Sequence, residues 1–122
     1  MSASPTIELL AWSGCPSHTA AERELRGILD ELGVTDVSIV TTWIEDDATA
    51  AERRFVGSPT LRVDDEELIP PDPSDTFALT CRVYRLADGG FSPTPDPEQL
   101  RRALADRFAT TQRVAPPRGR QE

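Results

Sequence analysis

The chain has 122 residues, 38% hydrophobic and 28% charged, a composition typical of one globular domain with a modest core. Its formal net charge of -8 gives no basis for general affinity toward nucleic acid or an anionic membrane. No stretch approaches the roughly 20 apolar residues that cross a bilayer, and the N-terminus lacks the basic region of a signal peptide. We therefore expect a cytoplasmic protein with no nucleic-acid and no membrane partner. In a reducing compartment we expect the two cysteines of the chain to be free, reactive, metal-binding or transiently bridged rather than joined in a permanent structural disulfide.

The first third of the chain shows a strand followed by a helix. Residues 6–12 form a short apolar run after a proline and predict a buried strand. Residues 17–32 show helical spacing, with charged side chains on the opposite face and Gly33 placed to end the helix. The face that we expect to pack on the core consists of Ala20, Leu25, Ile28, Leu29 and Leu32.

The same alternation repeats in the next segment. Residues 36–44 are rich in β-branched side chains and predict a second strand. Residues 45–55 predict a second helix, with acidic residues in its first turn and Arg53 and Arg54 in its last. The helix dipole favours this distribution of charge, which supports the helical interpretation.

Beyond this helix the pattern predicts a hairpin and then a loop. The expected elements are a turn at 57–59, a third strand at 60–63, a turn at 64–65, and a short strand ending near Leu68. Residues 69–80 are rich in proline and predict a surface loop.

The last part of the chain contains one ambiguous segment and one clear helix. Residues 81–91 fit either a strand with a Gly-Gly turn or an irregular turn, and we favour the strand. A final amphipathic helix begins after Asp96 as its cap, with Pro97 at the first helical position. We therefore expect one domain over residues 1–110 and a flexible C-terminal tail over residues 111–122, which is rich in Pro, Gly and Arg.

The predicted order is β-α-β-α-β-β-α. A strand-helix-strand start implies parallel pairing through a crossover, and a terminal hairpin adds antiparallel strands. The expected fold class is α/β, a small mixed sheet of about four strands with helices on both faces.

Candidate chemistry lies in the segment "WSGCPSH", between the first strand and the first helix. A thiol at a helix N-terminus has a lowered pKa because the free amides and the dipole stabilise the thiolate, so Cys15 is a candidate nucleophile. Gly14 allows close backbone approach and Pro16 stiffens the turn. His18, one turn into the helix, is placed to stabilise a thiolate or to shuttle a proton. The alternatives are a small buried hydrophobe at Cys15 and a solvated side chain at His18.

The segment "GSPT" is the second informative stretch. Gly57 and Pro59 immediately before a strand predict a tight turn, in which Ser58–Pro59 is a candidate cis peptide bond. Two tryptophans flank the region: Trp12 is placed to shield the thiol from water, whereas Trp43 is expected to pack in the core at a strand end.

Together, "GCPSH" and "FVGSPTLRVDDEEL" resemble the thioredoxin-like superfamily, and the resemblance covers most of residues 6–108. It implies that Cys15 takes the position of the nucleophilic first cysteine and that Pro59 is the cis proline that packs against it. It also implies that the substrate-facing residues are Trp12, Gly14, Pro16, Ser58 and Pro59.

Two features depart from that pattern. His18 stands where the second, resolving cysteine is expected, so ordinary dithiol exchange cannot occur within the motif. The added segment "CRVYR" contains Cys81, and its combination with "GCP" and "GSPT" resembles small bacterial thioredoxin-like proteins often labelled as related to alkylmercury lyases. If the chain brings Cys81 near Cys15, the two sulfurs form a disulfide or hold a soft ion such as mercury. The alternative is that Cys81 is a buried strand residue beside Val83.

Three functional hypotheses follow. The first is thiol-disulfide redox chemistry of monothiol type at Cys15, acting on protein or small-molecule thiols and disulfides. In this hypothesis Cys81 or a low-molecular-weight thiol completes the cycle, with His18 assisting and no other cofactor. The second is binding of mercury or an organomercurial by Cys15 and Cys81, or lyase-type chemistry on one. The third is a non-catalytic interaction module that binds a partner through the surface at Pro59, favoured if Cys15 is buried and inert.

Overall fold

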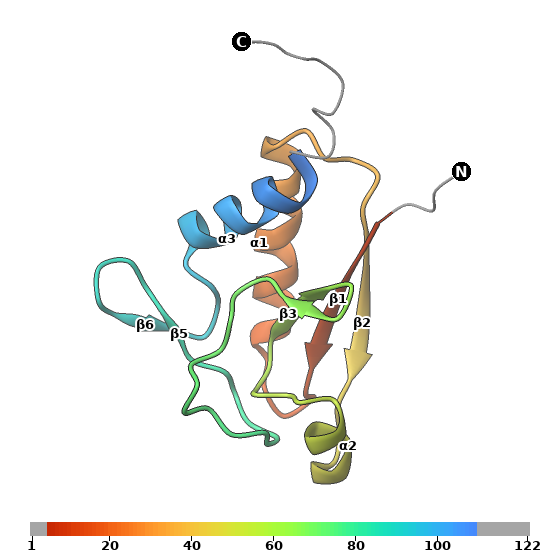
Figure 1. Cartoon of the computed structure of the whole chain (residues 1–122), viewed down its shortest axis with the longest axis vertical. Helices are drawn as coiled ribbons and strands as arrows, with labels where there is room; N and C mark the ends of the chain where they lie inside the picture. Colours follow the sequence, from red (N-terminus) through yellow and green to blue (C-terminus); the bar gives the residue numbers. More distant parts are fainter. Residues whose placement is uncertain (1–4, 110–122) are drawn as a thin grey trace.

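The computed structural model describes residues 5–109, so the tail predicted at 111–122 lies outside the described residues. Within that range no helix is long and apolar enough to cross a membrane. The elements in chain order (Figure 1) are β1 (Thr6–Ala11), α1 (Ser17–Glu31), β2 (Ser38–Trp43), α2 (Asp47–Glu52), β3 (Thr60–Val63), β4 (Glu66–Glu67), β5 (Tyr84–Arg85), β6 (Phe91–Ser92) and α3 (Pro97–Leu104), which continues as a π-helical turn (Ala105–Ala109).

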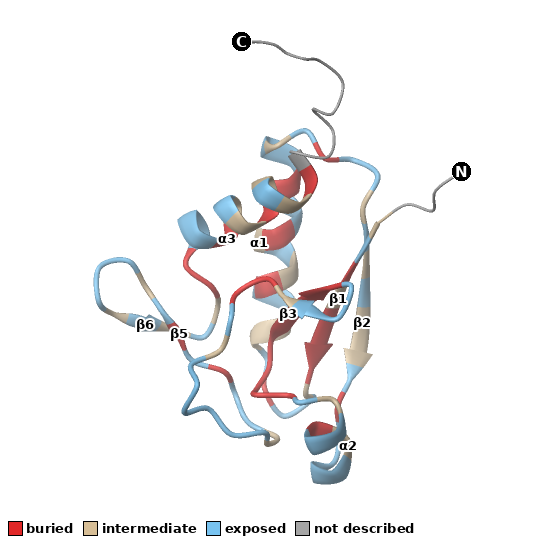
Figure 2. Ribbon diagram, in the orientation of Figure 1, coloured by how far each residue is buried: buried red, intermediate tan, exposed pale blue. Residues whose placement is uncertain are grey.

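A four-stranded mixed sheet forms the centre of the molecule, in the order β2-β1-β3-β4. β1 pairs in parallel with β2 and antiparallel with β3, which in turn pairs antiparallel with β4. Because β1 and β3 are central and β2 lies at an edge, the first two are mostly buried and β2 is only half-buried (Figure 2). The expected mixed α/β architecture with about four strands is confirmed.

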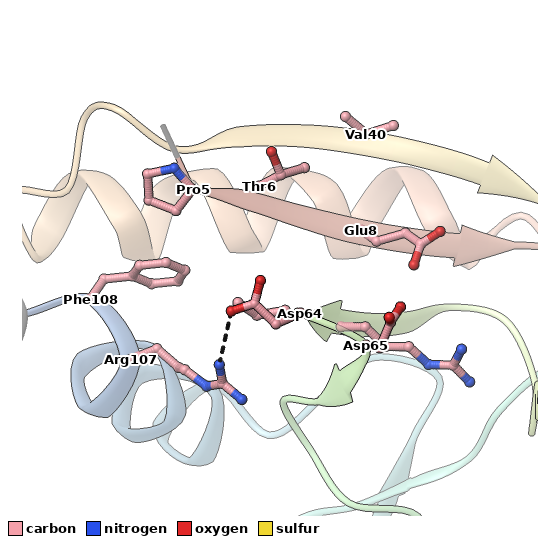
Figure 3. Close-up of a pocket in the computed structure, with 10 residues that line it drawn as sticks. Pro5, Thr6, Glu8, Val40, Asp64, Asp65, Arg107 and Phe108 are labelled. Atoms are coloured by element: carbon pink, nitrogen blue, oxygen red, sulfur yellow. Dashed lines mark ion pairs between the residues drawn. The ribbon is translucent and has the colours of Figure 1, made fainter. Parts of the chain in front are cut away.

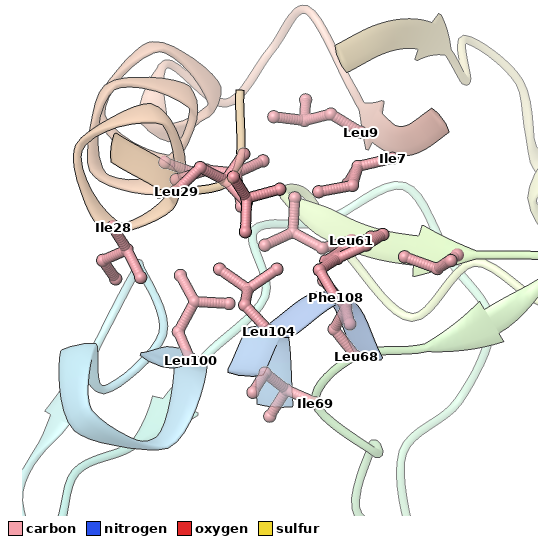
Figure 4. Packing of buried hydrophobic residues seen from close by; sticks show 14 of the residues in the cluster. Ile7, Leu9, Ile28, Leu29, Leu61, Leu68, Ile69, Leu100, Leu104 and Phe108 are labelled. Atoms are coloured by element: carbon pink, nitrogen blue, oxygen red, sulfur yellow. The ribbon is translucent and has the colours of Figure 1, made fainter. Parts of the chain in front are cut away.

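One face of the sheet is covered by α1 and α3. Ile7 and Leu9 of β1 point into this layer and belong to the same buried cluster as Leu29 of α1 and Leu104 of α3 (Figure 4). Residue Ala21, not Ala20 as predicted, completes the buried face of α1, because Ala20 lies one position off the apolar stripe and is exposed. The helix residues buried in this core are Ala21, Leu25, Ile28, Leu29, Leu100 and Leu104.

The end of α1 and the start of α3 are as the sequence predicts. Gly33 follows α1 with a φ of 75°, a left-handed conformation that glycine adopts without a steric penalty. Asp96 caps α3 by accepting hydrogen bonds from the backbone N–H groups of Glu98 and Gln99, and Pro97 occupies the first turn. The N–H of Ala87 also donates to Asp96, so these backbone bonds hold the pKa of the Asp96 carboxyl below its ordinary value.

The opposite face of the sheet carries the short helix α2 near the end of β1. Leu10, Ile44, Ala50 and Phe55 form a small separate cluster there, so helices lie on both faces, though unequally. The predicted end of α2 is wrong: the helix stops at Glu52, and its last turn contains neither of the two arginines that follow.

The hairpin and the last third of the described chain are partly as expected. Asp64 and Asp65 have φ values of 53° and 66°, which suits the tight hairpin between β3 and β4. Residues 69–80 contain no helix or strand, as predicted. The predicted strand at 81–91 is wrong in extent, because only Tyr84–Arg85 pairs with Phe91–Ser92, as a separate two-stranded sheet.

Candidate functional site

The two cysteines, 66 positions apart in the sequence, are joined by a disulfide with their Cα atoms 5.6 Å apart. This spacing is typical of a disulfide. The structure therefore brings together the two sulfurs whose separation the sequence left open. No cysteine in the chain remains free in this form.

Cys15 is positioned by the turn between β1 and α1. Its backbone N–H donates to the Trp12 carbonyl at 3.0 Å, which closes the turn. The Trp12 ring lies against the α-carbon of Gly14, where an added β-carbon would stand 2.5 Å from the ring. The close approach expected at Gly14 is thus made by Trp12, and Pro16 directly precedes the first helical residue.

Cys81 is positioned by backbone pairing with the turn before β3. The N–H of Ser58 donates to the Thr80 carbonyl and the N–H of Arg82 donates to the Ser58 carbonyl, both at 2.8 Å. These two bonds form an isolated parallel bridge that sets Cys81 beside Ser58. The Ser58–Pro59 bond is cis, as predicted.

A cluster of buried side chains fixes the segment that follows Cys81. The Arg82 side chain, only 4% exposed, donates to Glu67 at 3.1 Å and to the Ile69 carbonyl at 2.7 Å. Its guanidinium stacks over the Tyr84 ring at 4.3 Å, and the Tyr84 hydroxyl donates to the Pro59 carbonyl. Burial raises the pKa of Tyr84, so its hydroxyl keeps the proton that it donates. We call Arg82, Glu67 and Tyr84 the Arg82 anchor.

Glycine at position 57 is required by this arrangement. Gly57 has a φ of 135°, and a β-carbon there would stand 2.8 Å from the Cα and N atoms of Arg82. The backbone that carries Cys81 can pass close to this turn only because Gly57 has no side chain.

The two cysteines differ in exposure. Cys15 is fully buried, at 0% exposure, whereas Cys81 is exposed. The alternative that Cys81 is a buried residue beside Val83 is therefore wrong, and Val83 is itself 64% exposed. Ser58 and Pro59, expected to face a substrate, are both buried beneath residues 80–84 in the disulfide form.

Polar groups from two elements surround the Cys15 sulfur. The Ser17 hydroxyl lies 3.7 Å from Sγ and the Ser58 carbonyl oxygen lies 3.5 Å from it. Within residues 5–109, Ser58 Oγ is one of two buried side-chain polar atoms without a hydrogen-bond partner; the other belongs to Glu24.

His18 contacts the backbone of Cys15 rather than its sulfur. Its Nδ1 lies 3.2 Å from the Cys15 carbonyl oxygen, to which a protonated Nδ1 donates. Its ring meets the Trp43 ring edge-on, with centroids 5.0 Å apart. Trp43 is 48% exposed, so the predicted core packing of this residue is wrong, because it ends the edge strand β2. Trp12 is half-buried and packs beside the Leu10 cluster.

Acidic residues of the β3–β4 hairpin form ion pairs with arginines. Glu67 accepts from Arg62 as well as from the anchoring arginine. Glu66 pairs with Arg107. In the described part of the chain there is no group of three or more His, Cys, Asp or Glu side chains able to hold a metal ion.

A pocket lies on the open face of the sheet, and neither cysteine lines it. It has a volume of about 740 Å³ and is lined by Pro5, Glu8 and Val40 on one side and by Asp64 and Phe108 on the other (Figure 3). Its walls include neither cysteine nor Ser58, so it is not the entrance to the disulfide.

Sequence reasoning found both cysteines and the cis proline but missed Arg82, Glu67 and Tyr84, which hold Cys81 in place. The only local signal was an arginine next to a cysteine in an apolar context, which does not identify an anchor. Comparisons of the chain with protein-family models, curated proteins and solved structures gave no match.

Proposed function

We propose that the protein is a thioredoxin-like thiol-disulfide redox protein whose reactive pair is Cys15 and Cys81. The observation that carries the proposal is the Cys15–Cys81 disulfide at the start of α1, held against the cis Ser58–Pro59 turn. The element order, the cysteine before α1 and the cis proline before β3 support the thioredoxin-like assignment. The sequence allowed a monothiol at Cys15; the adjacent Cys81 favours a pair.

The chemistry is reversible exchange of two electrons and two protons. An external thiol opens the disulfide and a second thiol completes its reduction, leaving two cysteine thiols and an external disulfide. In reverse, the reduced pair donates its electrons to a disulfide substrate. A low-molecular-weight thiol is sufficient as reductant, and the reaction needs no other cofactor.

A redox titration tests this proposal. The protein is equilibrated in buffers of reduced and oxidised dithiothreitol, quenched by alkylation, and weighed as the intact chain. We expect two labels or none on each molecule, and an equilibrium that is the same from either direction. A Cys81→Ser variant is the matched control and must lose the paired transition. A disulfide that opens only when the protein unfolds is structural, and that result contradicts the proposal.

The same proximity favours soft-metal binding as a second candidate function. When reduced, two adjacent thiolates suit a soft ion such as Hg²⁺. Stoichiometric mercury binding to the reduced protein is expected to require both cysteines. Full affinity in the Cys81→Ser variant contradicts a two-thiolate site. The organomercurial reaction additionally needs an acid. Glu67, the acidic hairpin residue that belongs to the Arg82 anchor, already forms ion pairs with two arginines.

The interaction-module hypothesis finds mixed support. The burial of Cys15 fits it, but Pro59, through which a partner would bind, is fully buried in this form, and Cys81 is an exposed residue.

A further inference from the structure

We infer that Cys81, not Cys15, is the cysteine that exchanges with external thiols and disulfides, and that Cys15 is the leaving and resolving thiol. The inference rests on the proposed redox function and assigns opposite roles to those implied by the resemblance. It follows from the different surroundings of the two sulfurs.

Access is the first argument. Thiol-disulfide exchange requires an incoming thiolate to reach one sulfur from the side opposite the bond that breaks. Cys15 has no exposed surface, so attack on its sulfur requires the turn, the helix start or the Ser58 segment to move. Cys81 is exposed on a segment bordered by the exposed residues Thr80 and Val83. We therefore expect an incoming sulfur to approach the disulfide from the exposed side of the Cys81 segment.

The leaving group is the second argument. Attack on Cys81 expels Cys15 as a thiolate, at the beginning of the 15-residue helix α1. The positive end of the helix dipole stabilises that charge. The Ser17 hydroxyl, 3.7 Å from Cys15 Sγ, can donate a hydrogen bond to it. Attack on Cys15 would instead expel Cys81, which does not precede a helix. In the described structure the nearby Thr80 hydroxyl contacts the Cys81 carbonyl oxygen and not its sulfur.

An external thiol reduces the protein in two steps, the first of which is attack by its thiolate on the internal disulfide. The thiolate forms a bond to Cys81 Sγ, the Cys15–Cys81 bond breaks, and its electron pair stays on Cys15. A second external thiolate then attacks the mixed disulfide at its external sulfur, which yields an external disulfide and the Cys81 thiolate. Starting from the reduced protein, the Cys81 thiolate attacks an external disulfide and releases one external thiolate. Cys15 then attacks Cys81 Sγ, restores the internal disulfide, and releases the second external thiolate.

The Arg82 anchor explains how Cys15 can attack a mixed disulfide at Cys81 and restore the internal bond. While an external group is bound to Cys81, the Ser58 backbone bonds and the contacts of Arg82 and Tyr84 still hold this segment over Cys15. The two sulfurs thus stay close, which gives the attacking Cys15 a high effective concentration. Loosening the anchor is expected to prolong the life of a mixed disulfide on Cys81.

The first experiment locates the mixed disulfide in the wild-type protein. The oxidised protein is mixed with excess reduced glutathione, quenched with acid at successive times, and fragmented as the intact chain in a mass spectrometer. We expect early glutathione adducts on fragments that contain Cys81 and not on those that contain Cys15. Adducts mainly on Cys15, or equally on both, overturn the inference.

The second experiment compares the two thiols one at a time. Reduced Cys15→Ala and Cys81→Ser variants react with 5,5′-dithiobis(2-nitrobenzoate), each folded and in guanidinium chloride. We expect Cys81 to react within a few-fold of its unfolded rate, and Cys15 to be slowed by about 10-fold or more on folding, because access limits the reaction. A Cys15 thiol that is slowed no more than Cys81, in a variant whose circular dichroism is native, contradicts the inference. If a variant does not fold, the wild-type experiment decides.

The two proposals fail in distinguishable ways. If glutathione forms adducts and the internal disulfide opens reversibly, but the adducts lie on Cys15, the redox function stands and only the assignment of roles is wrong. If the folded protein forms no adduct and its disulfide never opens, both proposals are wrong.

Discussion

Breaking the Cys15–Cys81 disulfide is expected to lower the free energy of unfolding by about 4 kcal/mol. The bond links positions 66 residues apart and thus closes a large loop in the unfolded chain. In the chain-entropy model a loop of this length removes about 15 cal/mol/K of entropy from the unfolded state, which corresponds to that free energy at 25 °C. The folded state loses little in comparison, because the Ser58 pairing and the Arg82 anchor hold the Cys81 segment without the bond.

Urea unfolding measures this difference. The oxidised wild type, the wild type kept reduced by dithiothreitol, and the Cys15→Ala/Cys81→Ala variant are followed by circular dichroism. Alanine is chosen at position 15 because the site is fully buried and a serine hydroxyl would need a partner there. We expect the reduced wild type and the double variant to fold, with similar midpoints well below that of the oxidised protein.

Two results would refute this reasoning. A difference below about 1 kcal/mol between oxidised and reduced wild type would mean that the cross-link does not restrict the unfolded chain as the entropy model assumes. A reduced protein without native circular dichroism in the absence of urea would show that the anchor does not preserve the fold. The resolving step proposed for Cys15 would then lose its structural basis.

Two further predictions concern the partly buried carboxylates of Glu24 and Glu8. Burial, with a smaller contribution from Asp96, raises the pKa of Glu24, which has a buried oxygen without a partner, so the folded state favours the protonated form. Glu24→Gln is therefore expected to stabilise the protein by about 1 kcal/mol at pH 7, with the gain shrinking as the pH falls toward 4.5; an unchanged or lower urea midpoint at pH 7 contradicts this. Although burial opposes it, hydrogen bonds from Thr42 and Arg53 lower the pKa of Glu8, so its contribution to stability is present above pH 4.5 and is lost as the pH falls through its folded value. Glu8→Gln is expected to cost about 1 kcal/mol at pH 7 and less in acid, and thermal unfolding across this range that shows a pH-independent cost rules out the ion pair as the cause.

Local patterns were sufficient for the elements that frame the site. The apolar spacing of α1 with Gly33 behind it, and the Asp96 cap before α3, specify their helices from residues a few positions apart. β3 was predicted with its observed bounds, because a turn precedes it and two aspartates that adopt left-handed conformations follow it. The end of α2 could not be found in the same way: Arg54 leaves the helix with a φ of 55°, and its carbonyl accepts a bond from the distant Arg62.

The environment of Cys81 depends on contacts that no local pattern contains. The segment around it has the composition of a strand, yet its backbone makes only an isolated bridge, to Ser58. The buried guanidinium of Arg82 finds its carboxylate at Glu67, 15 positions earlier, and its stacking partner at Tyr84. Periodicity records whether a side chain is apolar, but it does not show which distant charge neutralises a buried arginine. The sequence therefore identified both cysteines as candidates but did not predict the Arg82 anchor.

Which cysteine is exposed follows from the same long-range contacts, and it changes how the motif is interpreted. A cysteine before a helix is expected to be the attacking thiol, since the helix start activates it. That activation stabilises the thiolate equally when it is the group that leaves. In this chain residues 80–82 pair with Ser58, and Cys81 is the exposed cysteine of the disulfide. The helix start therefore lies at the buried cysteine, Cys15. In the proposed exchange the helix therefore favours opening of the disulfide by attack on Cys81. Because the sequence contains two cysteines, Cys81 is the chain's own partner for Cys15.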